Sequence, residues 1–127
     1  MQDQPTPSEI LGAVAAFLKD EVAAGVQGAL NFKVRVAANA LEIARRNLDL
    51  APPAEAVERE RLAALLGQGE GSLFDLNAEL CRRIEGGEVT LATPGLREHL
   101  FATTLAKLAV DQPTYSGYRA LLAKQKP

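Results

Sequence analysis

The sequence predicts an all-α protein, built as an up-and-down bundle of five main helices followed by a short C-terminal helix. Alanine and leucine dominate the composition, β-branched residues are sparse and tryptophan is absent, a balance that favours helices over strands. Apolar residues recur at the helical period, and short stretches with proline or glycine separate the periodic segments. Because these connections are short, successive helices should run antiparallel. With 127 residues, the chain fits a single domain spanning 1–127.

Residues 32–50 form the stretch around which the other helices are predicted to pack. Stepped at about 100° per residue, its apolar side chains cover more than half of the helix circumference. These side chains are Phe32, Val36, Ala37, Ala40, Leu41, Ile43, Ala44, Leu48 and Leu50, and the remaining arc carries Arg35, Asn39, Glu42, Arg45, Arg46 and Asp49. One neighbour cannot cover so wide an arc, so we expect this helix in the middle of the bundle. Asn31 is predicted to cap its start, and Pro52 and Pro53 to end it.

Capping patterns predict where the first and fifth helices begin. Thr6 and Glu9 have the spacing of a capping box, and Pro7 falls at the first helical position. Thr93 and Pro94 repeat this pattern, so a fifth helix should start there and run to about residue 110. Both starts follow from local sequence alone.

Two further helices are predicted between the central helix and the fifth. The third covers about 54–66 and carries a charged surface at 58–61, and the fourth begins at a capping box formed by Ser72 and Asp75. The glycine-rich stretch 67–71 separates them. No strand precedes it and no Lys-Ser/Thr pair follows it, so we interpret it as a linker and not as a phosphate-binding loop.

The apolar stripes of these three helices predict the core. Its members should be Val57, Leu62, Leu65 and Leu66 on the third helix, Leu73, Phe74, Leu76, Leu80, Cys81 and Ile84 on the fourth, and Leu96, Leu100, Phe101, Leu105 and Leu108 on the fifth. Cys81 is interpreted as a small core residue. As the only cysteine, it cannot form an internal disulfide, which suits a reducing cytoplasm.

Four polar residues on or beside the apolar faces leave two interpretations open. Asn39 and Asn77 are predicted to hydrogen-bond a neighbouring helix, because an unpaired buried amide is costly; contact with a ligand or partner is the alternative. Lys107 should pair with a carboxylate or reach solvent, with an activated amine as the alternative. His99 has no acidic or cysteine partner at ligand spacing, so we interpret it as a structural or surface residue.

Residues 111–118 form the most distinctive segment of the chain. They contain both tyrosines, Tyr115 and Tyr118, on either side of Ser116 and Gly117. In one interpretation the rings fix the C-terminal helix to the bundle. In the other they form a partner surface, because tyrosine combines an apolar ring with a polar hydroxyl.

Composition argues against several functional classes. The formal net charge is −2 and the pI about 5.4, so no electrostatic footprint for nucleic acid is present. No apolar run is long enough to span a bilayer and the start lacks a secretory pattern, so we expect a cytoplasmic protein. One histidine and one cysteine nearly exclude a soft metal site. Without a Ser/His/Asp set or a dinucleotide loop, we expect no metal, no cofactor and no self-contained catalysis.

Three stretches of the chain resemble a bacterial family of small helical proteins of unknown function. They are PTPSEIL at 5–11, RVAANAL at 35–41 and LAKLAVDQPTYSGY at 105–118, and the resemblance covers nearly the whole chain. Members of that family typically accompany an aminoglycoside-phosphotransferase-like kinase and an acyl-CoA dehydrogenase, and some are joined to the kinase. The small protein of levulinate-type catabolism, which works with a kinase for 4-hydroxyacyl-CoA, is similar. The resemblance implies no catalytic residues.

The resemblance and the missing catalytic set together predict a non-catalytic accessory subunit that binds and supports a phosphotransferase-type kinase acting on hydroxyacyl-CoA. The alternative is a small-molecule or acyl-CoA-binding module without a kinase partner, in which Arg35, Arg46 and Lys107 meet phosphates. A homodimer of the isolated chain is also consistent with an accessory role, because the partner surface is then uncovered. The predicted partner-binding residues are Arg35, Asn39, Asp111, Tyr115, Ser116, Tyr118 and Arg119.

Overall fold

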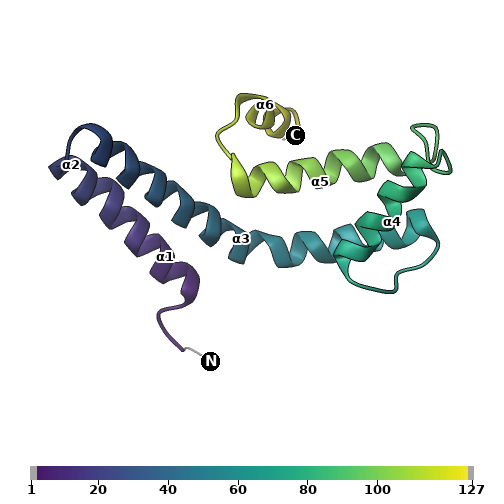
Figure 1. Ribbon diagram of the computed structural model, residues 1–127, viewed down its shortest axis with the longest axis horizontal. Helices are drawn as coiled ribbons and strands as arrows, with labels where there is room; N and C mark the ends of the chain where they lie inside the picture. Colours follow the sequence, from purple (N-terminus) through teal and green to yellow (C-terminus); the bar gives the residue numbers. More distant parts are fainter. Residues whose placement is uncertain (1–2, 126–127) are drawn as a thin grey trace. The chain divides into compact units, whose positions relative to one another are not determined.

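The computed structural model describes residues 3–125, and every regular element in that range is helical, which confirms the all-α prediction. The chain forms two compact units, an N-terminal one up to Ala51 and a C-terminal one from Pro52; the single domain over 1–127 stays a prediction. The elements (Figure 1) are α1 (Pro7–Ala16), the π-helix η1 (Phe17–Val22), α2 (Ala23–Gly25), α3 (Gly28–Leu66), α4 (Leu73–Glu85), α5 (Leu96–Asp111) and α6 (Ser116–Gln125).

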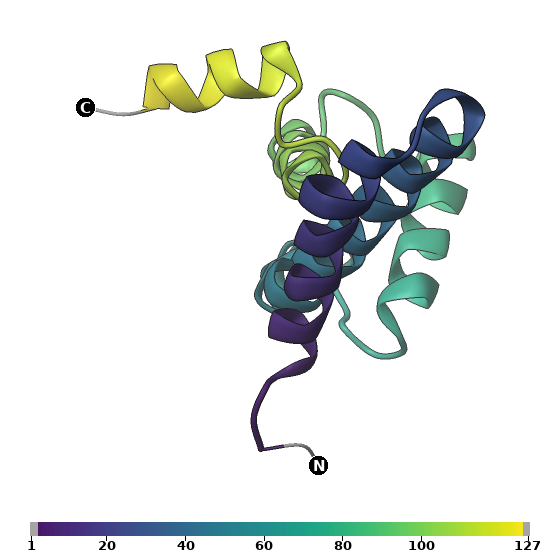
Figure 2. The same cartoon turned by 90° about the vertical axis from the view of Figure 1, so that its left-hand side faces the viewer.

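The N-terminal unit is a helical hairpin. The helices α1, η1 and α2 lead to a short turn, after which the first part of α3 returns beside them (Figures 1 and 2). The buried residues of this unit are all alanines: Ala15, Ala23 and Ala38. Gly12 also allows a close approach, since a Cβ added there would lie 3.2 Å from the Cδ of Arg45. The hairpin thus has close helix contact, and no large side chain among its described residues is fully buried.

Thr6 caps α1 as predicted. Its Oγ1 accepts a hydrogen bond from the Glu9 N–H at 3.2 Å, and the Glu9 carboxylate accepts from the Thr6 N–H at 2.7 Å. These bonds, the backbone one first, lower the pKa of Glu9. Pro7 is the first helical residue, where its missing N–H costs no intrahelical bond.

The turn between α2 and α3 differs from the prediction for Asn31. The helix begins before that residue, at Gly28, whose φ of 63° lies in the left-handed region that suits glycine. The Asn31 side chain instead donates to the carbonyl oxygens of Ala23 at 2.6 Å and Val26 at 3.2 Å. Asn31 therefore satisfies carbonyls at the end of the preceding helix and does not cap the next one.

The helix α3 runs through Pro52 and Pro53 without a break. The prediction that the central helix ends there, and that a separate third helix follows, is wrong. A proline inside a helix removes one N–H donor and crowds the carbonyl four residues earlier, here those of Leu48 and Asp49. All four residues are exposed to solvent, so water can hydrate the carbonyls that lose their donors.

The first part of α3 is not enclosed as predicted. Phe32 is 70% exposed and Val36 50% exposed, and Ile43, Leu48 and Leu50 are exposed as well. The expected place in the middle of a bundle is therefore wrong for this part of the helix. Within the N-terminal unit one face of α3 meets α1, and a second apolar face meets solvent.

The C-terminal unit holds a leucine-rich core. The second part of α3, α4, the connection after α4 and the start of α5 all contribute to it. The helix α5 runs back along the second part of α3 (Figure 1), and Arg61 Nη2 donates across this pair to Thr103 Oγ1 at 3.3 Å. The cluster consists of Leu62, Leu66, Leu76, Leu80, Val89 and Leu96, with Leu65 and Leu73 packed against it. All of these except Val89 were predicted.

Several other residues predicted for this core are exposed, so their assignment is wrong. The apolar stripe predicted for each helix was wider than the face that a neighbouring helix covers. On α4 the buried residues are Leu76 and Leu80. The exposed ones are Val57, Phe74, Cys81, Ile84, Leu100 and Phe101.

The segment 58–61 is more than the charged surface that was predicted. Arg59 Nη1 donates to the carbonyl oxygens of Gly69 at 3.3 Å and Gly71 at 2.9 Å. This arginine therefore fastens the glycine-rich linker to α3. The linker begins at Gly67, whose φ of 72° ends α3.

Charged side chains also join α4 to the end of α3. Glu79 accepts from Arg82 Nη2 at 2.8 Å and from Arg83 Nε at 2.7 Å, and these hydrogen bonds lower the pKa of Glu79 to about 2. Arg83 Nη1 donates in addition to the carbonyl oxygen of Leu66 at 3.1 Å. One of the orphan carbonyls of α3 is satisfied in this way.

The fifth helix starts later than predicted. Its first residue is Leu96, and its N-cap is Gly95, which has φ of 89° and supplies no side-chain hydrogen bond. Thr93, predicted to cap this helix with Pro94 behind it, instead accepts a hydrogen bond from the Thr90 N–H at 2.9 Å. The threonine hydroxyl thus closes the preceding turn, and the helix begins after it.

Truncating Leu62 tests the core. Leu62 is 0% exposed, so Leu62→Ala should lower the free energy of unfolding by about 2–5 kcal/mol through lost contacts and a residual cavity. The control Leu91→Ala, at an exposed leucine of the same unit, should change it by less than about 0.5 kcal/mol. Urea denaturation followed by circular dichroism measures both. Equal effects of the two variants would contradict this core.

Candidate partner-binding site

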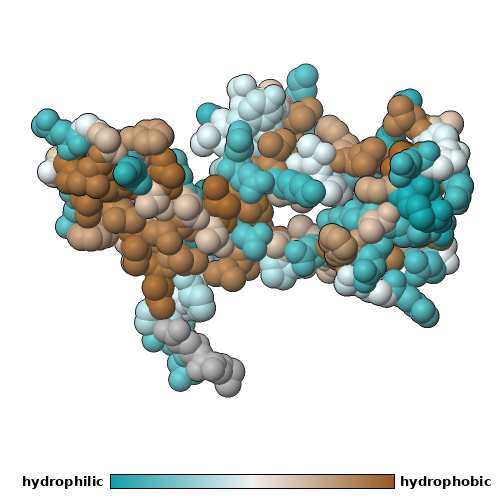
Figure 3. All heavy atoms as spheres, in the orientation of Figure 1, coloured by the Kyte–Doolittle hydropathy of each residue, from teal (hydrophilic) through white to brown (hydrophobic). Residues whose placement is uncertain are grey.

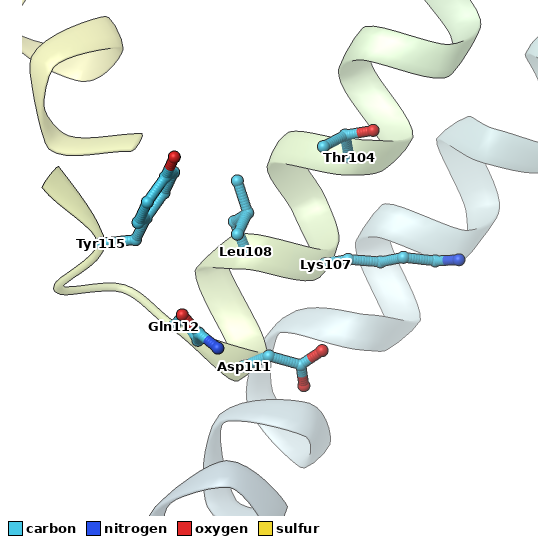
Figure 4. Close-up of a pocket in the computed structure, with 6 residues that line it drawn as sticks. All are labelled: Thr104, Lys107, Leu108, Asp111, Gln112 and Tyr115. Atoms are coloured by element: carbon cyan, nitrogen blue, oxygen red, sulfur yellow. The ribbon is translucent and has the colours of Figure 1, made fainter. Parts of the chain in front are cut away.

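The end of α5 and the segment leading to α6 form an open hollow of about 290 Å³. Leu108 and the Tyr115 ring supply apolar surface, and the other side chains supply a hydroxyl, an amine, a carboxylate and an amide. Asp111 and Tyr115 are two of the predicted partner-binding residues. The lining residues (Figure 4) are Thr104, Lys107, Leu108, Asp111, Gln112 and Tyr115.

A β-turn redirects the chain at this hollow. The Tyr115 N–H donates to the Gln112 carbonyl oxygen at 3.0 Å, with Pro113 at the position where its fixed φ suits a turn. On one side, the Gln112 N–H donates to the Leu108 carbonyl at 2.9 Å and closes α5; on the other, the Arg119 N–H donates to the Tyr115 carbonyl at 3.0 Å. Backbone hydrogen bonds therefore hold both ends of the turn.

The Tyr115 ring lies against the backbone of Gly117. A Cβ added at Gly117 would lie 2.8 Å from Cε1 and 3.1 Å from Cζ of Tyr115, so the ring can occupy this place only beside glycine. The side chain remains 52% exposed. Figure 4 shows the ring near Leu108, with Lys107 extending away from it. Exposed tyrosines are enriched among the residues that dominate binding energy at protein interfaces.

The remaining predicted residues of this corner belong to α6. Ser116 and Arg119 are exposed, whereas Tyr118 is half-buried. No residue of the described part of α6 is buried, and the helix extends away from the end of α5 (Figure 2). We call the hollow together with Ser116, Tyr118 and Arg119 the α5–α6 corner.

Arg35 and Asn39, the other two predicted contact residues, lie on α3 in the N-terminal unit. Arg35 Nε donates to Asn31 Oδ1 at 3.0 Å, within the same helix. Asn39 is exposed and makes no hydrogen bond to another helix among residues 3–125, so that interpretation of it is wrong. Both residues belong to a different unit from the α5–α6 corner.

The C-terminal unit holds a polar cluster around the buried His99. His99 is 1% exposed, and within the described chain neither its Nδ1 nor the Nε of Arg61 has a hydrogen-bond partner. Next to them, Asn77 Nδ2 donates to Glu58 Oε1 at 2.9 Å, which confirms the internal contact predicted for Asn77. Burial, followed by the charge of Arg61, lowers the pKa of His99, and Glu58 opposes this shift. His99 is thus a structural residue that stays neutral at neutral pH.

Metal-binding clusters and membrane-crossing helices were sought among the described residues. Between residues 3 and 125, no three His, Cys, Asp or Glu side chains are placed so that they could hold a metal ion. No helix in that range combines the length and apolar character needed to cross a bilayer. Lys107, predicted to pair with a carboxylate or reach solvent, is exposed and forms no ion pair with residues 3–125.

A family model matches residues 24–115, which include all of α3, α4 and α5. The chain belongs to the DUF6285 family. That family is described as a domain of unknown function, so the predicted membership in an uncharacterised helical family is confirmed, and its association with kinases stays a prediction. All lining residues of the hollow lie inside the DUF6285 match, whereas Ser116, Tyr118 and Arg119 lie beyond it. No curated protein and no solved structure matches the chain.

His99 predicts a pH-dependent stability. Its pKa in the folded state lies below the ordinary value of 6.5, so the unfolded chain takes up a proton first as the pH falls through that value. The free energy of unfolding should decrease from about pH 6.5 down to the folded-state pKa, by at most about 1.4 kcal/mol per pH unit. Denaturant titrations across this range measure the slope. The variant His99→Leu should lose this component, and an unchanged slope would contradict the assignment.

Proposed function

We propose that the protein is a non-catalytic accessory subunit that binds and supports a phosphotransferase-type kinase acting on hydroxyacyl-CoA in the cytoplasm. The observation that supports this best is the exposed Tyr115 ring, which lies beside Gly117 at the rim of a small hollow. Aromatic anchors beside a pocket are enriched among the residues that dominate binding energy at protein interfaces. The resemblance of residues 105–118 to proteins that accompany such kinases supports the choice of partner.

The chemistry of the α5–α6 corner suits a protein partner. Lys107 and Asp111 present both signs of charge beside hydrogen-bonding groups of Thr104 and Gln112, a mixture common at the polar rim of interfaces. The hollow is open, and its volume of about 290 Å³ lies just below the roughly 300–1,000 Å³ of small-molecule pockets. A space of this size suits a single side chain of a partner.

The alternative of a small-molecule or acyl-CoA-binding module rests on Lys107. Its exposed amine at the hollow is available to a phosphate or carboxylate. Arg35 and Arg46, the other cations of that hypothesis, belong to the N-terminal unit. Calorimetric titration with acetyl-CoA separates the two functions: saturable binding that Lys107→Gln removes would favour the module.

The kinase hypothesis predicts a specific loss of binding on truncation of Tyr115. In calorimetry with the purified kinase that accompanies this chain, Tyr115→Ala should weaken binding at least about tenfold, because the exposed anchor is lost. The matched control is Phe74→Ala, which truncates an aromatic residue that is 81% exposed on α4 and should leave the affinity unchanged. No binding by the unmodified chain, with unchanged kinase activity, would reject the function.

A second variant tests the position of the ring and not its presence. Gly117→Ala places a Cβ within 2.8 Å of the Tyr115 ring and should displace it while every side chain of the corner is retained. We expect weaker kinase binding than for the unmodified chain. Normal binding by both Gly117→Ala and Tyr115→Ala would locate the partner surface elsewhere.

A further inference from the structure

Two polar side chains, His99 and Arg61, meet where α5 packs on the second part of α3. His99 is 1% exposed on α5, and Arg61 Nη2 donates to the hydroxyl of Thr103 at 3.3 Å. Residues four apart lie on one face of a helix, so the guanidinium lies along the face of α5 that carries His99. The charge of Arg61 also lowers the pKa of His99, which shows that the two groups are near each other.

The contact between these two side chains leaves polar atoms unsatisfied. Within residues 3–125, the Nδ1 of His99 and the Nε of Arg61 are both buried without a hydrogen-bond partner. The carboxylate of Glu58 accepts instead from Asn77 Nδ2 at 2.9 Å. A buried polar atom without a partner destabilises the packed arrangement. The junction of α3 and α5 is therefore held by the packing around this pair and not by a complete hydrogen-bond network.

The charges around His99 oppose its protonation. Two charged groups act on the imidazole, Arg61 and Glu58, and both come from α3. Asn77 of α4 and Thr103 of α5 are uncharged. Burial and the Arg61 cation lower the pKa of His99, and the Glu58 carboxylate raises it by less. An imidazolium at this position would be a second buried cation beside Arg61, so the closed arrangement favours the neutral ring.

The part of α5 that follows His99 is held more weakly than its start. The buried residues of α5 are Leu96 and His99, so nothing after His99 in this helix is buried. Leu100 and Phe101 are exposed, and Figure 3 shows apolar residues at the surface over α5. Segments with few buried apolar contacts open at a lower free energy than a core does. This part of α5 can therefore separate from α3 while Leu96 stays in the leucine core.

We propose that His99 is a pH-sensitive switch: when its imidazole takes up a proton, α5 from His99 onward separates from α3, while α4 and the leucine core stay folded. Opening hydrates the imidazolium and relieves its repulsion by Arg61. The opening is local and precedes the unfolding of the whole unit. Four lining residues of the hollow lie on this part of α5, so opening also alters that surface. The inference does not rest on the kinase-binding function, because it is tested without a partner.

Hydrogen exchange of single backbone amides tests the proposal on the full chain by NMR, from about pH 7.5 to about pH 4.5, with correction for the intrinsic exchange rate. A detached helix of this length is marginal in water, so its amides exchange once it opens. The open form should become up to about tenfold more populated per pH unit below 6.5, until the folded-state pKa of His99 is reached. Protection should fall at residues 103–110 and not at Leu76 and Leu80 of α4.

Three variants separate the switch from a general effect of acid. His99→Gln keeps a neutral polar side chain and should remove the pH dependence at residues 103–110. Arg61→Met should reduce it, because the repelling cation is lost, and this variant decides the question if His99→Gln does not fold. The matched control Arg97→Met removes an exposed cation of α5 and should leave the pH dependence unchanged. Equal loss of protection in α4 and α5, no loss in either, or unchanged pH dependence in both His99→Gln and Arg61→Met would overturn the proposal.

Discussion

The continuity of α3 across Pro52 and Pro53 is the constraint on which both units depend. The first part of this helix of 39 residues forms one side of the hairpin. Its second part forms one side of the leucine core. Each proline inside a helix costs about 3 kcal/mol relative to alanine, so packing on either side must offset a considerable local cost. Leu62 and Leu66, among the most buried residues of the chain, lie after the prolines and contribute that packing.

The two parts of α3 bury very different side chains. After the prolines, the helix buries leucines against α4 and α5; before them, it buries Ala38 against the hairpin. Burial of apolar area yields roughly 25 cal/mol per Å², so alanine contacts contribute little. The hairpin thus gains close approach between its helices but retains Phe32 and Val36 on its surface. Its stability would increase with anything that covers that surface.

Signals that act within a few residues were readable from the sequence. The capping boxes at Thr6 and Ser72 form as predicted, because each needs only its own turn of helix. Thr93 shows the limit of such signals: its hydroxyl could serve a helix start or a turn, and the turn is observed. Leucine periodicity identified nearly the whole core but also included exposed residues such as Phe74.

What the sequence could not supply was the identity of the covering neighbour. An apolar arc predicts that a surface is buried but does not identify the element that covers it. The exposed apolar face of α3 was therefore predicted to lie inside a bundle. The sequence left His99 as a structural or surface residue for a related reason, since its burial depends on residues near Arg61 that are distant in sequence. For the candidate site, the tyrosine segment was predicted, whereas the close approach of the Tyr115 ring to Gly117 depends on the conformation of the turn and was not predicted.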